Sequence, residues 1–170
     1  MPRREELTRR PDELPRPEEL QRPEDKPIEL VEFLSPIPEA VPVARRHVVG
    51  VLHEWGLSTL TETASLLACE LVSNAVKHGS PAAEAPTGAG AQQIVLTVRH
   101  HAGLFIEVWD PGSKGLHPRV RAAAPHDEVG RGLQLVDTLS RSWGHYAPAY
   151  GGRTVWCELV TPRRGERSRH

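Results

Sequence analysis

The chain has 170 residues, of which 38% are hydrophobic and 25% are charged, and its formal net charge is −1. This length is enough for one sizeable hydrophobic core, and the balanced charge excludes the strong basic excess typical of nucleic-acid-binding proteins. No apolar run approaches the roughly 20 residues that cross a bilayer, the first residues lack the apolar core of a signal peptide, and the 2 cysteines are too few for a disulfide framework. We therefore expect a single cytoplasmic domain with neither a nucleic-acid nor a membrane partner.

The two ends of the chain differ in composition from the part between them. Residues 1–27 are dense in Arg, Glu and Pro and contain few large apolar side chains. Such a segment cannot bury enough surface to offset its ordering entropy, so we expect a disordered arm. It is either a solvating tail or a docking segment for a partner. Residues 162–170 form a short basic tail, which leaves residues 28–161 as the expected folded domain.

The hydrophobic pattern of residues 28–161 predicts helices placed before and between strands. In chain order we expect a strand at 28–33, helices at 38–55 and 59–78, a surface loop at 80–90, a hairpin formed by strands 92–99 and 104–109, a helix at 130–139, and strands near 143–146 and 154–160. This order predicts an α+β fold, a two-layer sandwich.

The second expected helix carries an unusual polar stripe. Glu70, Asn74 and Lys77 lie one and two turns apart on one face, while alanines, leucines and valines occupy another. An asparagine inside a helix is costly because its amide competes for backbone hydrogen bonds. Taken alone, the stripe is either the solvated face of an amphipathic helix or a site in which a carboxylate and an amide oxygen hold a cation and a polarised water.

Two later segments support a functional site. The strand that ends at Trp109 continues into Asp110-Pro111-Gly112, and Gly130-Arg131-Gly132-Leu133 opens an apolar-periodic helix. A helix with Glu and Asn, a strand that ends in Asp-x-Gly and a Gly-x-Gly helix start, in this order, resemble the GHKL ATPase superfamily of gyrase, the ninety-kilodalton heat-shock chaperone and histidine kinases. The closest resemblance is to the bacterial anti-sigma-factor serine/threonine kinases and related single-domain regulators, and it covers about residues 28–160.

The resemblance implies a mixed, mostly antiparallel sheet covered on one face by helices, with ATP and Mg²⁺ bound between the helices and the sheet. It implies that Asn74 holds Mg²⁺, which prefers oxygen ligands, and that Glu70 is the general base. Asp110 would accept a hydrogen bond from the adenine amino group, and Gly112 would let the backbone approach the ring.

The remaining candidate residues concern the phosphates and the last strand. Gly130, Gly132 and the adjoining Leu133 would leave backbone N–H groups free for phosphate at a helix N-terminus. Arg131 either reaches a phosphate or faces solvent, and Lys77 either balances phosphate charge or merely flanks the site. The resemblance also implies a hydroxyl near adenine at Thr154, although strand threonines are common for packing reasons alone.

Two features depart from the family pattern. The second glycine of the adenine motif comes one residue late, at Gly115, and the lid at 113–129 is short. Two functions therefore stay open. One is a serine/threonine kinase that phosphorylates a small antagonist protein and sequesters a sigma factor. The other is a binding module that switches between ATP and ADP states without turnover. The resemblance also suggests a homodimer formed through the first strand and helix.

Overall fold

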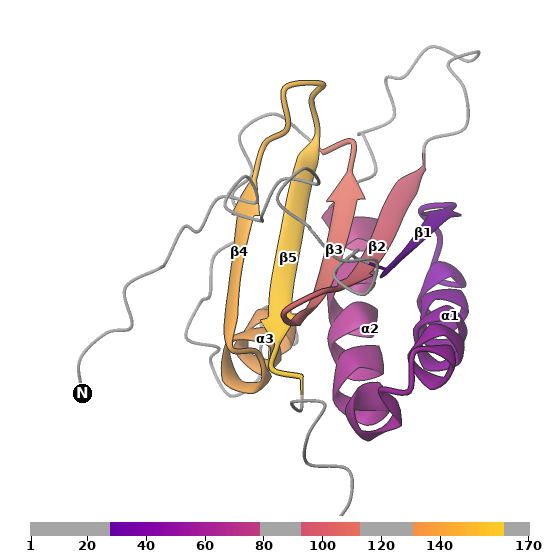
Figure 1. Ribbon diagram of the computed structural model, residues 1–170. Helices are drawn as coiled ribbons and strands as arrows, with labels where there is room; N and C mark the ends of the chain where they lie inside the picture. Colours follow the sequence, from indigo (N-terminus) through magenta and orange to yellow (C-terminus); the bar gives the residue numbers. More distant parts are fainter. Residues whose placement is uncertain (1–27, 79–92, 113–130, 162–170) are drawn as a thin grey trace, which may run out of the picture.

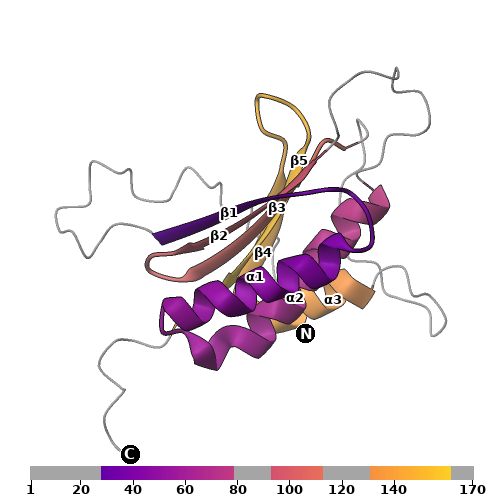
Figure 2. The same cartoon turned by 90° about the vertical axis from the view of Figure 1, so that its right-hand side faces the viewer.

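A computed structural model describes residues 28–78, 93–112 and 131–161, which form two layers (Figure 1). One layer is a five-stranded sheet in the order β1-β2-β3-β5-β4. Figure 2 shows α1, α2 and α3 together on one side of this sheet. The elements are β1 (Ile28–Leu34), α1 (Ala40–Glu54), a 3₁₀ turn η4 (Ser58–Leu60), α2 (Thr61–His78), β2 (Ile94–His100), β3 (Leu104–Asp110), α3 (Arg131–Leu139), β4 (Ser142–Tyr146) and β5 (Arg153–Leu159).

These elements confirm the expected two-layer α+β fold, and their bounds lie within a few residues of the predicted ones. Every strand pair among the described residues is antiparallel, in keeping with the expected mostly antiparallel sheet. The predicted arm, the loop at 80–90, the lid at 113–129 and the basic tail lie outside the described residues. No helix in the described part of the chain is both long and apolar enough to cross a membrane.

The strands alternate between two faces of the sheet, because successive side chains on a strand point in opposite directions. On β3, Leu104, Ile106 and Val108 are buried in the core with the helices, and we call this side the helix-covered face. Phe105, Glu107 and Trp109 point to the other side, which we call the open face. The predicted hairpin between β2 and β3 turns at residues 101–103, where the His101 N–H donates to the Gly103 carbonyl at 3.1 Å.

The helices contribute the other half of the core. Ala44, Val48 and Leu52 recur every four residues on α1 and are fully buried. On α2, Leu67 and Leu71 are buried in the same way. Full burial of a large apolar side chain contributes about 1.5–3 kcal/mol to the stability of the fold. These apolar residues therefore hold both helices against the sheet.

A glycine ends α1 and directs the chain into α2. Gly56 has a φ of 68°, and the Leu57 N–H donates to the Leu52 carbonyl at 2.8 Å while the Gly56 N–H donates to the His53 carbonyl at 3.0 Å. This pair of bonds satisfies carbonyls that the helix end would otherwise leave open. The turn returns the chain antiparallel to α1, so that α2 lies against the middle of the sheet (Figure 1).

Candidate functional site

The polar stripe lies on the last three turns of α2. Glu70 and Asn74 are half-buried and Lys77 is exposed, whereas Leu71 and Ala75 on the neighbouring face belong to the core. Figures 1 and 2 show that α2 and β3 run toward the same end of the molecule. The last turns of α2 therefore lie toward the end of the sheet at which β3 finishes.

The N-terminus of α3 lies directly against Glu70. A Cβ added to Gly132 would be 2.4 Å from Glu70 Oε2 and 3.7 Å from Glu70 Cβ, so no larger residue fits unless the carboxylate moves. Glycine at 132 thus has a steric reason in addition to the free backbone N–H expected from the sequence. The first turn of α3 carries N–H groups and the positive end of the helix dipole, which together favour an anion.

Asp110 and Gly112 occupy the end of β3. Asp110 lies on the helix-covered face and is 1% exposed. Gly112 has a φ of 55°, in the left-handed region that favours glycine, and an added Cβ would lie 3.2 Å from Asp110 Oδ1. Glycine at 112 therefore lets the chain turn past the Asp110 carboxylate without covering it.

Arg153, which the sequence analysis did not single out, is the partner of Asp110. The two residues are opposite each other in the β3–β5 register. Arg153 Nε and Nη2 donate to Asp110 Oδ2 at 3.2 and 2.9 Å. A carboxylate this deeply buried is tolerated only when it is paired. In the sequence, Arg153 was visible only as a basic residue just before the last expected strand.

Thr154, for which the resemblance implied a hydroxyl near adenine, lies on the other face of the sheet from Asp110. Thr154 pairs with Trp109 and therefore points to the open face, one residue after Arg153. There it lines a pocket together with Tyr146. The physical reason is the twofold alternation of a strand, because a shift of one residue moves a side chain to the opposite face of the sheet.

The other candidates are only partly described. Gly130 and the lid lie outside the described residues, as does the side chain of Arg131, although its backbone starts α3. The side chain of Leu133 is buried. Among the described residues no group of three or more His, Cys, Asp or Glu side chains is arranged to hold a metal ion.

A Mg²⁺ ion that bridges nucleotide phosphates does not need such a group. It is usually held by one or two protein oxygens, the substrate phosphates and water. The half-buried Asn74, one turn from the Glu70 carboxylate, supplies oxygens of the required kind. Gly132, in the first turn of α3, approaches the Glu70 carboxylate so closely that a Cβ there would lie 2.4 Å from Oε2. The described residues therefore fit the ion.

A family model described as the histidine kinase-like ATPase domain matches residues 34–158, which include all the described helices, β2 to β4, β5 up to its next-to-last residue and the candidate residues. No curated protein matches the sequence. The match covers most of the length of the chain, and the chain therefore belongs to the histidine kinase-like ATPase domain family.

Proposed function

We propose that this protein binds ATP with Mg²⁺ on the helix-covered side of the sheet and is a serine/threonine kinase of the anti-sigma-factor type. It would transfer the γ-phosphate to a small antagonist protein and sequester a sigma factor. The observation that carries the proposal is the approach of Gly132 to Glu70, because it brings a candidate base and an anion-binding helix end together.

Each residue has a distinct role in this proposal. Glu70 accepts the proton of the attacking hydroxyl. Asn74 would hold Mg²⁺ through its side-chain oxygen, and the bound ion would supply positive charge to offset that of the phosphates. The first turn of α3 donates backbone N–H groups to the phosphates. These groups position the reactants and stabilise charge, which is most of what phosphoryl transfer requires.

Asp110 would recognise the adenine ring. A carboxylate accepts hydrogen bonds through both of its oxygens, so the pairing of Oδ2 with Arg153 is compatible with a bond from the adenine amino group to Oδ1. The two bonds from Arg153 also hold this buried carboxylate in a fixed orientation. Arg153 is therefore a positioning residue for base recognition.

A nucleotide-dependent switch without turnover is the second candidate. It is favoured by the late glycine at 115 and the short lid. Glu70 favours the kinase, because a pure switch needs no base. Both functions require the same ATP site, and they differ in whether ADP is produced.

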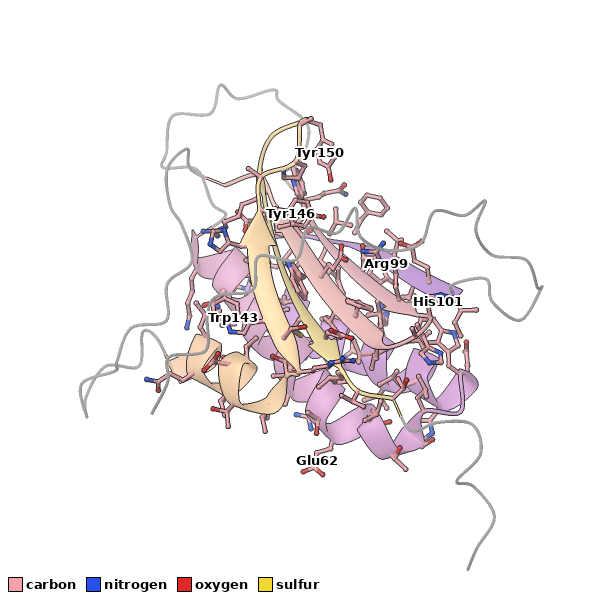
Figure 3. All side chains as sticks on the ribbon, turned by 60° about the vertical axis from the view of Figure 1, so that its left-hand side comes forward. Glu62, Arg99, His101, Trp143, Tyr146 and Tyr150 are labelled. Atoms are coloured by element: carbon pink, nitrogen blue, oxygen red, sulfur yellow. The ribbon has the colours of Figure 1, made fainter. Side chains whose placement is uncertain are left out.

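The test is calorimetric titration of the purified protein with ATP, with and without Mg²⁺, followed by measurement of ADP production. We expect saturable, Mg²⁺-dependent binding that Asn74→Ala abolishes. Glu70→Gln should retain binding and lose ADP production. Glu62→Gln is the matched control, because Glu62 is an exposed carboxylate two turns earlier on α2 and points away from the sheet (Figure 3).

The outcomes separate the two candidates. Mg²⁺-dependent binding without detectable ADP production, also in the presence of candidate antagonists, favours the switch. If Glu70→Gln produces ADP at the parent rate, Glu70 is not the base. Absence of ATP binding at millimolar concentration contradicts both functions.

A further inference from the structure

A second pocket lies on the open face, away from the candidate ATP site. Its volume is about 230 Å³ and it is lined by Val95, Thr97, Glu107, Trp109, Tyr146, Tyr150 and Thr154. Figure 3 shows Tyr146 on β4 and Tyr150 beyond its end, both at the same end of the sheet. The pocket is smaller than the roughly 300–1,000 Å³ of typical small-molecule sites, which matches a single side chain better than a nucleotide.

The aromatic wall of this pocket depends on the connection between β4 and β5. The Trp109 indole N–H donates to the Gly151 carbonyl at 3.0 Å, and the ring centroids of Trp109 and Tyr150 are 6.2 Å apart. A Cβ added to Gly152, which has a φ of 80°, would lie 2.4 Å from Trp109 Nε1 and 2.5 Å from the Asp110 carbonyl oxygen. Only a glycine at 152 lets the connection close onto Trp109 in this way.

The charged residue of the pocket lining is Glu107. Glu107 is 9% exposed and forms an ion pair with Arg99, which lies two residues along β2 from the position opposite Glu107. Glu29 is opposite Arg99 on β1, so this part of the open face has two carboxylates for one guanidinium. Burial raises the pKa of Glu107 against the opposing effect of Arg99. Burial also raises the pKa of Tyr146, and the negative charge of Glu107 raises it further.

We propose that this pocket binds the guanidinium group of an arginine side chain on a partner protein. Aromatic faces beside a carboxylate are the surroundings that favour a planar cation, and the hydroxyl oxygens of Thr97 and Thr154 can accept its N–H groups. Tyrosine and tryptophan around an arginine are also the residues enriched at the energetic centres of protein interfaces.

The surroundings of the pocket favour a protein as the source of the arginine. Phe33 and Val31 lie on β1 opposite Val95 and Thr97 of the pocket, on the same face. Phe33 is 63% exposed and Val31 is also exposed. This apolar border would contact the residues that flank the arginine in a partner, whereas a free small cation would not use it.

The test follows the Trp109 indole N–H by NMR in the full-length ¹⁵N-labelled protein, with the resonance assigned by Trp109→Phe. The first probe is N-acetyl-arginine methylamide, and its control is the citrulline analogue, which has the same shape and no charge. We expect a saturable shift with arginine and none with citrulline. Equal shifts with both compounds, or none with either, would overturn the proposal.

Two variants test the role of the carboxylate. Glu107→Gln should weaken arginine binding by about tenfold or more, as expected from loss of a charge-assisted bond. Glu158→Gln is the matched control, because Glu158 is equally buried on the open face and pairs with Arg141 outside the pocket. Unchanged binding by Glu107→Gln contradicts the proposal. If Glu107→Gln does not fold, Tyr150→Ala, which alters a side chain that is 79% exposed, should weaken binding instead.

The source of the arginine is tested separately. A tripeptide with leucine on both sides of arginine should bind about tenfold more tightly than the single-residue probe, and equal affinities would contradict a protein partner. Residues 1–27 contain arginines of their own, at positions 3, 4, 9, 10, 16 and 22. If replacing them all by glutamine in the full-length chain shifts the Trp109 resonance without any ligand, the occupant is the chain itself and the partner proposal is wrong.

Discussion

The two faces of the sheet accommodate buried charge in different ways. On the helix-covered face, Leu104, Ile106 and Val108 of β3 are aliphatic, and a charged residue appears only at the end, at Asp110. On the open face, Glu107 lies in the middle of the same strand, between Phe105 and Trp109. Both carboxylates pair with an arginine on a neighbouring strand.

This difference shows how coverage by helices determines where polar chemistry can occur. The centre of a covered face excludes water, so a charge there would lose its hydration without replacement. The candidate ATP site lies at the margin of that face, where α2 and β3 end. The open face keeps some access to solvent, and it therefore holds an ion pair at its centre and a pocket beside it.

The largest loss of stability should come from breaking the ion pair between Arg153 and Asp110 at the margin of the helix-covered face. Arg153→Met leaves Asp110 buried without its ion-pair partner, which typically costs about 3–5 kcal/mol of unfolding free energy. Denaturant unfolding measures this loss. Arg99→Met is the comparison on the open face, where the arginine side chain is 25% exposed, and it should cost less. A larger loss for Arg99→Met would contradict the distinction between the faces.

A smaller effect is expected from two adjacent residues of β3 that face opposite ways. Ile106 is fully buried on the helix-covered face, so Ile106→Ala should cost about 2–5 kcal/mol through lost burial and a cavity. Phe105 is only half-buried on the open face, and Phe105→Ala should cost less despite removing more atoms. Equal losses in denaturant unfolding would mean that the open face is packed as tightly as the covered one.

The smallest effect concerns the pH dependence of stability at Glu107. Its folded-state pKa is raised above the ordinary 4.5 by burial, so the folded protein holds this proton more tightly than the unfolded chain does. As the pH rises from the ordinary value through the folded pKa, the unfolded chain ionises first, and the free energy of unfolding falls.

Glu107→Gln removes this contribution. The unfolding free energy of the parent minus that of the variant should therefore decrease as the pH rises through this window, as measured by denaturant titrations at several pH values. An increase would show that attraction to Arg99 outweighs the burial of Glu107. Glu158→Gln, which removes an equally buried carboxylate on the same face, is the reference for non-specific effects of a lost carboxylate.

The local sequence was sufficient to predict most of the elements and one part of the site. The apolar periodicity of α2 and the alternation of β2 and β3 determined these elements, because helix and strand periods are properties of short segments. Glu70 and Asn74 are one turn apart on any helix. Gly112 and Gly132 were singled out from their positions in the motifs, and the structure adds a positive φ at Gly112 and the close approach of Gly132 to Glu70.

Only the tertiary structure decided which distant residues meet. Arg153 is 43 residues from Asp110 in the chain, and their pairing depends on the register of β3 with β5. The same register places Thr154 on the open face and builds the pocket with Glu107 and Tyr146. Register is set by how whole strands pack against the helices and against one another, and a slip of one residue would reverse both faces. The sequence by itself therefore determined the elements and their motifs, and the pairing of strands determined which of their side chains share a site.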